Sequence, residues 1–121
     1  VNKLFEQRGD WDQAKGQELA NTALTQFGNE IDVIFCNNDG MALGAAQAIA
    51  ANGRTVGKDI ALVGVDALEE CQQMVKDGTM TGTVLNDHIG QAQKAADAAK
   101  LVVEGGTLEK NYTVDYVKIT E

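Results

Sequence analysis

The chain has 121 residues, of which 44% are hydrophobic and 23% charged, a composition typical of one globular domain with a core of its own. Its formal net charge is -8, with only 10 Lys and Arg residues, so the clustered cations that hold a phosphate backbone are absent and nucleic acid is excluded as a partner. The chain starts with Val rather than Met, which predicts a processed or truncated piece.

The first predicted strand is the short apolar run at residues 1–5. Asp10, with Gln13 three residues later, forms a capping-box-like start for the first helix. Gly28 follows the apolar face of that helix and is expected to end it.

Residues 31–36 are a near-continuous run of β-branched and aromatic side chains, which predicts a strand covered on both faces, as in a parallel sheet. A helix follows within two residues, and either Asn38 or Asp39 supplies the side-chain oxygen that caps it. Gly44 keeps the inner face of this helix thin enough to lie close on a sheet. The helix is expected to end at Asn52-Gly53.

Residues 60–65 form the next continuous apolar run, again typical of a strand buried on both faces. Asp66 follows, and a helix with an acidic first turn ends at Gly78. The two cysteines have neither metal-ligand spacing nor the density of a disulfide scaffold, so Cys36 and Cys71 are expected to be buried free thiols.

Residues 80–85 are the fourth predicted strand, and Asn86-Asp87 lead from it into the longest helix. That helix carries an apolar stripe over residues 89–103, and a last strand at residues 112–119 completes the chain. The alternation of strands and helices with short turns predicts an α/β fold with a doubly wound, largely parallel sheet flanked by helices.

Ligands of open α/β sheets bind beyond the carboxyl ends of the strands, so the residues at four turns are the candidates for function. These are Trp11, Asn38-Asp39, Asp66 and Asn86-Asp87. An aromatic ring beside carboxylate and amide groups suits a neutral polyhydroxyl ligand, because the polar groups exchange hydrogen bonds with hydroxyls while the ring covers an apolar face. The turns hold no Gly-rich nest, Lys or Arg for phosphate.

Each candidate also has a purely structural interpretation. Asn38, Asp66 and Asn86 suit helix N-caps, and Trp11 could equally pack at the start of a helix. His88 has no partner motif and is expected to be solvated, and Asp32 suits a solvated strand end. The binding hypothesis therefore depends on the four turns taken together.

Four segments carry a resemblance to a known family: WDQA at 11–14, NNDGMALG at 37–44, GVDAL at 64–68 and GTVLND at 82–87. They are similar to consecutive signatures of the periplasmic galactose/glucose-binding protein family, and the resemblance covers nearly the whole chain. The second segment is shared with ribose-binding proteins and LacI-type repressor cores. Trp11 and the last two segments are those typical of galactose or glucose binding.

The resemblance implies roles for individual residues. Trp11 would stack on a pyranose ring, and Asn38, Asp66 and Asn86 would hydrogen-bond its hydroxyls. Asp32 falls where the family has a Glu that binds calcium, which implies a calcium ligand in the intact parent; no other cofactor is expected.

The same resemblance implies that residues 1–121 are a partial C-terminal lobe of a two-lobe sugar-binding protein, in which residues 88–104 form a helix of the other lobe. The implied function is to bind a hexose, galactose or glucose, for uptake through the membrane permease of an ABC transporter. The implied location is periplasmic or extracellular, with a lipid anchor on the missing N-terminus. The fragment is expected to dimerise or to pair with the missing lobe.

The alternative function is the effector-binding core of a LacI-type transcription regulator, which would require an upstream helix-turn-helix segment. A small α/β enzyme is disfavoured, because the sequence has one His, no Ser-containing nucleophile elbow and no nucleophile beside a base.

Overall fold

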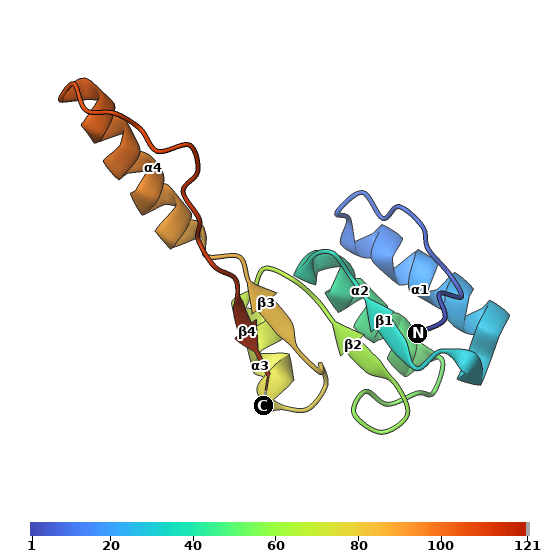
Figure 1. Cartoon of the computed structure of the whole chain (residues 1–121). Helices are drawn as coiled ribbons and strands as arrows, with labels where there is room; N and C mark the ends of the chain where they lie inside the picture. The colour runs from blue at the N-terminus through green and yellow to red at the C-terminus, as the bar shows by residue number, and fades with distance from the viewer. Residues whose placement is uncertain (121) are drawn as a thin grey trace.

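The computed structural model describes residues 1–120, and they form a body from which one helical arm projects (Figure 1). In chain order the elements are α1 (Gln13–Phe27), η1 (Gly28–Glu30), β1 (Val33–Phe35), α2 (Asp39–Ala51), β2 (Ala61–Val63), α3 (Glu69–Lys76), β3 (Thr83–Leu85), α4 (His88–Val103) and β4 (Val117–Ile119). The α/β class predicted from the sequence is confirmed.

The strands follow one another across the body. β1 and β2 pair in parallel with Val33 opposite Ala61, and β3 and β4 pair antiparallel. A parallel bridge between Val63 and Gly82 joins the two ladders. The carboxyl ends of β1, β2 and β3 therefore lie at the same edge of the strands, where the candidate turns are.

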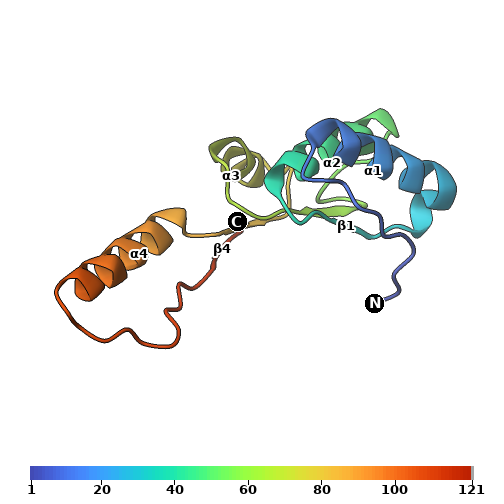
Figure 2. The ribbon, with the colours of Figure 1, turned by 90° about the horizontal axis from the view of Figure 1, so that it is seen from above.

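Helices α1, α2 and α3 lie on one face of the strands, while no helix covers the other face within residues 1–120 (Figure 2). The expectation that residues 31–36 are covered on both faces is wrong for β1. Val33 and Phe35 are 57% and 62% exposed, because no helix in the described part of the chain packs on their side. Ile34 points the other way and packs against the buried core.

Helices α1 and α2 cross with their backbones in contact. A Cβ atom on Gly44 would lie 2.1 Å from the carbonyl oxygen of Gln13, and one on Gly16 would lie 2.7 Å from that of Met41. Gly44 was expected to let α2 approach the sheet, and its close neighbour is α1 instead. Small side chains complete this contact, since Ala45 is fully buried.

The start of the chain differs from the prediction. Residues 1–5 form no strand, because a strand needs a neighbour to complete its hydrogen bonds and none is paired with them in the described residues. The N-cap of α1 is Asp12, whose side chain accepts from the N–H of Lys15 at 2.8 Å, and not Asp10. Asp10 has a positive φ of 50° and pairs with Arg8 and Lys15. Gly28 ends α1 as predicted.

The starts of the other helices show which of the predicted polar residues are N-caps. Asn38 is the N-cap of α2, and its side-chain oxygen accepts from Met41 N–H at 3.0 Å. Asp66 caps no helix, because the chain turns through two positive-φ residues before α3 begins after Leu68. Asn86 is also not a cap, since Asp87, one residue closer to α4, accepts from the N–H of Gly90. The predicted ends at Asn52-Gly53 and Gly78 are confirmed.

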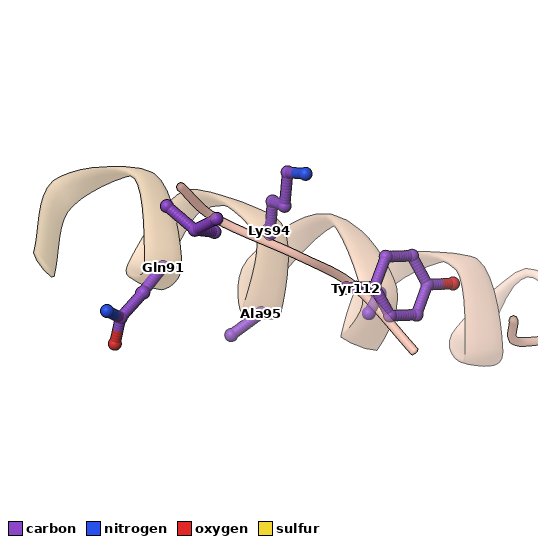
Figure 3. Close-up of a pocket in the computed structure, with 6 residues that line it drawn as sticks. Gln91, Lys94, Ala95 and Tyr112 are labelled. Atoms are coloured by element: carbon purple, nitrogen blue, oxygen red, sulfur yellow. The ribbon is translucent and has the colours of Figure 1, made fainter. Parts of the chain in front are cut away.

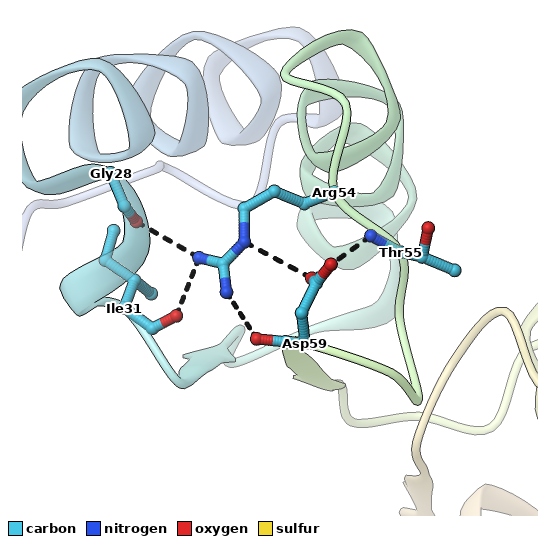
Figure 4. Close-up of polar contacts among 5 residues, drawn as sticks. All are labelled: Gly28, Ile31, Arg54, Thr55 and Asp59. Atoms are coloured by element: carbon cyan, nitrogen blue, oxygen red, sulfur yellow. Dashed lines mark hydrogen bonds and ion pairs between the residues drawn. The ribbon is translucent and has the colours of Figure 1, made fainter.

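Arg54 joins the α1–β1 and α2–β2 connections at the amino-terminal edge of the strands (Figure 4). Its side chain is only 10% exposed, and it donates to the carbonyl oxygens of Gly28 at 3.1 Å and Ile31 at 2.7 Å. It also donates to the Asp59 carbonyl and pairs with the Asp59 carboxylate at 3.3 Å. This anchor lies at the opposite end of the strands from the candidate turns.

Helix α4 and the segment that returns from it form the projecting arm (Figure 1). No residue of α4 is buried, and its predicted apolar stripe is open, with Ile89 67% and Val103 87% exposed. The predicted last strand is present as the shorter Val117–Ile119. Among residues 1–120, no helix combines the length and apolar character needed to cross a membrane.

Candidate functional site

The candidate turns form an open rim at the carboxyl ends of the strands. Trp11 precedes α1, Asn38 joins β1 to α2, Asp66 follows β2 and Asn86 follows β3. Hydrogen bonds connect these turns to neighbouring elements: the side-chain amide of Asn38 donates to the Trp11 carbonyl at 3.3 Å, and the Asp66 N–H donates to the carbonyl of Val84 in β3 at 2.8 Å. We refer to Trp11, Asn38, Asp66 and Asn86 as the rim residues.

Trp11 is the exposed aromatic group of the rim. Its side chain is 66% exposed, so it contributes little to the core. Asp10 and Trp11 have φ values of 50° and 64°, a left-handed turn that non-glycine residues rarely adopt. Such backbone strain costs about 1 to 3 kcal/mol per residue and persists where the surroundings enforce it.

Asn38 has a structural role and spare hydrogen-bonding capacity. Its oxygen caps α2 and its amide group donates to the Trp11 carbonyl, which fixes the side chain between the two turns. An amide oxygen has two lone pairs and an amide nitrogen two N–H groups, so one acceptor position and one donor remain. Asn38 can therefore exchange two hydrogen bonds with a ligand hydroxyl while it still caps the helix.

Asp66 lies on a second left-handed turn. Its φ is 109° and that of Ala67 is 54°. The side chain is half-buried, and no hydrogen bond to it is recorded within residues 1–120. Burial, and secondly the negative charge of Asp39, raise the pKa of the Asp66 carboxyl above its ordinary value. A half-buried carboxylate with unused acceptor sites is suited to receive hydrogen bonds from a ligand.

Asn86 is held against the first turns of α4. Its side-chain oxygen accepts from the Gln91 amide at 2.5 Å, which leaves its NH₂ group as a donor. Asp87 is occupied as the helix cap, so of this pair Asn86 is the residue placed to meet a ligand.

Asp39 was predicted as a possible cap of α2 and as one of the candidate turn residues, but the long-range hydrogen bonds of its side chain were not predicted. It is completely buried, and its carboxylate accepts from the Thr83 hydroxyl at 2.7 Å and the Leu68 N–H at 2.8 Å. The only local signal was an acidic residue directly after the cap position. Its partners come from 29 and 44 residues away in the sequence, which no local pattern reveals.

Asp32 lies apart from the rim, at the amino-terminal end of β1, and is exposed. The structure describes no group of three or more His, Cys, Asp or Glu residues within 1–120 that could hold a metal ion. His88 is exposed as predicted, and Cys36 and Cys71 are buried free thiols as predicted.

Two cavities are present among residues 1–120, and only the wider one touches the rim, through Trp11. A pocket of about 220 Å³ separates α4 from the returning segment, and its lining includes Gln91, Lys94 and Tyr112 (Figure 3). A wider one, of about 980 Å³, lies between residues 1–11 and the outer edge of β1, with Trp11 in its lining. Neither is lined by Asn38, Asp66 or Asn86. Within the described residues the rim is thus an open surface and not an enclosed site.

Strands that present polar turns at one edge, with helices between them, define a class of α/β ligand-binding lobes. The model of the "Periplasmic binding protein domain" family matches residues 2–107. The chain belongs to this family.

Named relatives and solved structures agree with that assignment. The chain is 38% identical over 106 residues to the D-galactose/methyl-galactoside binding periplasmic protein MglB of Haemophilus influenzae, covering 87% of this chain and 31% of that protein. It is 41% identical over 104 residues to the D-allose-binding periplasmic protein of Escherichia coli, covering 86% of this chain and 32% of that protein. A solute-binding protein of Bacillus halodurans with bound myo-inositol matches with a TM-score of 0.86 and 29% identity, covering 98% of this chain and 40% of that one. The chain thus spans about a third of the length of these curated relatives.

Proposed function

We propose that this chain is a partial C-terminal lobe of a two-lobe solute-binding protein that binds a hexose, galactose or glucose, for uptake by an ABC transporter. The observation that carries the proposal is the rim, where one exposed indole and three side chains with spare hydrogen-bonding capacity come from four separate turns. In the two-lobe protein the rim would be one wall of a cleft that closes on the sugar by hinge motion.

The chemistry of the rim matches a sugar better than a charged ligand. The indole of Trp11 offers a flat apolar surface to the C–H face of a pyranose. Asn38 and Asn86 donate and Asp66 accepts, so neighbouring hydroxyls find partners of both kinds. The rim residues include no Lys or Arg that would pair with a phosphate or carboxylate.

The preference for galactose or glucose is supported by Trp11 and by the GVDAL and GTVLND segments. Relatives are named for galactose, for allose and for ribose, so the family as a whole does not fix the sugar. An aromatic plate suits a six-membered ring, whose C–H groups form a flat face, and this favours a hexose.

We propose binding without catalysis. The candidate nucleophiles within residues 1–120 are the two buried thiols, and burial is the largest cause that raises the pKa of Cys36 to about 11 and that of Cys71 to about 12. Such thiols remain protonated and unreactive at neutral pH. The one His lies on the projecting arm, away from both.

The implied setting is the periplasm or cell exterior, with a lipid anchor on upstream residues, the membrane permease as partner and a calcium ion bound through Asp32 in the intact parent. Calcium requires about six to eight oxygen ligands, so most of that set would have to come from residues outside this chain.

Two bare surfaces support pairing with a second lobe or, for the isolated chain, with a second copy. They are the apolar stripe of α4, which includes Ile89 and Val103, and the face of β1 that carries Val33 and Phe35. Exposed apolar surface and an unpaired strand edge both favour association. A LacI-type regulator core would share these features, and the start of the parent gene distinguishes the two: a signal peptide for the transport protein, DNA-binding helices for the regulator.

Thermal unfolding of the two-lobe protein with glucose, galactose and ribose tests the proposal. A ligand that binds only the folded state stabilises it by RT ln(1 + L/Kd) at free ligand concentration L, so at one ligand concentration the tighter-binding sugar gives the larger rise in unfolding temperature. We expect a larger shift with galactose or glucose than with ribose. A larger shift with ribose would contradict the hexose assignment, and no shift with any sugar would contradict sugar binding.

A further inference from the structure

The carboxylate of Asp39 is buried between the turn after β2 and the start of β3. It has no exposed surface, and its two oxygens accept from different elements: Oδ1 from the Thr83 hydroxyl at 2.7 Å, and Oδ2 from the Leu68 N–H at 2.8 Å. No Lys, Arg or His pairs with it among the residues described. Its partners are instead one backbone N–H in the turn that contains Asp66, that of Leu68, and one hydroxyl at the start of β3, that of Thr83.

Thr83 links Asp39 to one further residue of the turn, Ala67. It is 1% exposed, and its hydroxyl oxygen, which donates to Asp39, also accepts from the Ala67 N–H at 3.2 Å. The two N–H groups that follow Asp66, those of Ala67 and Leu68, are therefore both bound by the Asp39–Thr83 pair. Asp66 and Ala67 are the residues with φ values of 109° and 54°.

Gly64 makes room for the carboxylate. A Cβ atom at this position would lie 2.2 Å from Asp39 Oδ1 and 2.7 Å from the Met80 methyl group. The turn after β2 can thus close over Asp39 only because Gly64, the first residue after the strand, has no side chain. The sequence Gly-Val-Asp-Ala supplies this gap two residues before Asp66.

We propose that Asp39 and Thr83 are positioning residues that hold the Asp66–Ala67 turn in its left-handed form and thereby set the affinity of the rim for its ligand. The inference rests on the proposed function in one respect, the contact of Asp66 with the sugar. The claim that they hold the turn depends only on the observed hydrogen bonds. Without these bonds, the backbone of Asp66 and Ala67 would relax toward ordinary φ values and turn the Asp66 side chain away from the rim.

Electrostatics link the same two acids. The charge of Asp39 is the second cause, after burial, of the raised pKa of Asp66. The other titratable groups against Asp39 are the thiols of Cys36 and Cys71, whose pKa values of about 11 and about 12 keep them neutral. Removal of the Asp39 charge should therefore lower the pKa of Asp66, a change that loss of packing alone would not produce.

Amide hydrogen exchange on the 121-residue chain tests the hold on the turn. Thr83→Val keeps the side-chain shape and removes the hydroxyl, and we expect exchange at Ala67 to accelerate about tenfold, as loss of one buried hydrogen bond allows. Thr83→Ser should restore slow exchange. Thr81→Val is the matched control, because the Thr81 hydroxyl accepts from the Leu62 N–H at 3.0 Å and does not contact the turn.

Exchange at Ala67 that stays at the wild-type rate in Thr83→Val would overturn the proposal. A carboxyl titration of Asp66 by NMR tests the electrostatic link between the two acids, in which Asp39→Asn should lower the midpoint; an unchanged midpoint would contradict that link.

The affinity for galactose or glucose in the two-lobe protein completes the experiment. We expect the dissociation constant to rise about tenfold in Thr83→Val and to recover in Thr83→Ser, with Thr81→Val unchanged. A loosened turn with unaltered affinity would overturn the link to binding. If the wild type bound no sugar, the proposed function would fall, and the exchange rates would still decide whether Asp39 and Thr83 hold the turn.

Discussion

Replacement of Trp11 with alanine separates a ligand contact from a packing role. The residue is 66% exposed, which for a tryptophan of about 250 Å² corresponds to about 165 Å² of accessible surface, and a sugar stacked on one face would cover about half of it. At about 25 cal/mol per Å² this contact contributes about 2 kcal/mol, within the range of about 1 to 3 kcal/mol expected for such a contact. The dissociation constant for galactose or glucose should therefore rise about 30-fold.

The assay is calorimetric titration of the two-lobe protein. Trp11→Phe keeps a smaller ring and should lose only part of the affinity. Tyr116→Ala is the matched control, since Tyr116 is 63% exposed but lies on the returning segment of the arm. Stability should change by no more than about 0.5 kcal/mol in Trp11→Ala, as is usual for an exposed residue. An unchanged dissociation constant would refute the stacking role, and a large loss of stability would show that the indole packs after all.

Three further predictions concern the charge of Asp66, the packing of α1 on α2, and the behaviour of the chain without a second lobe. Because the pKa of Asp66 is raised in the folded chain, its ionised form destabilises the fold. Asp66→Asn should therefore be more stable than wild type at neutral pH in urea unfolding, and the advantage should disappear as the pH falls below the ordinary pKa of Asp; an advantage that grows in acid would contradict this. Gly44→Ala should lower the free energy of unfolding by about 3 kcal/mol, since its Cβ would lie 2.1 Å from the Gln13 carbonyl, and a loss below about 1 kcal/mol would show that α1 and α2 separate easily. The 121-residue chain alone should bind glucose about three decades more weakly than a complete protein, because about three charged hydrogen-bond partners would be missing, and it should self-associate. Sedimentation at several concentrations with a calorimetric titration checks this, and a compact monomer with micromolar affinity would contradict it.

Local chemistry was enough to predict the helices and most of their ends. The side chain of Asn38 caps α2, and Gly28 ends α1, because capping depends on a few adjacent residues that the sequence lists directly. Asp10 was predicted as the cap of α1 because Gln13 stands three residues after it, as in a capping box. The cap is Asp12 instead, because Asp10 and Trp11 form a left-handed turn that their residue types do not predict.

Features that depend on distant partners could not be predicted. Residues 1–5 have strand-like composition but no paired neighbour in the described chain, and Phe35 is apolar but uncovered, because burial depends on what packs against a strand and not on the strand itself. Asp39 is the clearest case. Its role follows from Thr83 and Leu68, which only the folded chain brings to it. The rim residues were selected by topology, which places the ends of parallel strands together whatever the sequence between them.

The structure of the two-lobe protein with galactose or glucose bound tests the central claim most directly. We predict a pyranose ring that lies against the Trp11 indole, with its hydroxyls hydrogen-bonded to Asn38, Asp66 and Asn86. A sugar bound elsewhere, or bound on this rim without contact to Trp11 and Asp66, would contradict the claim.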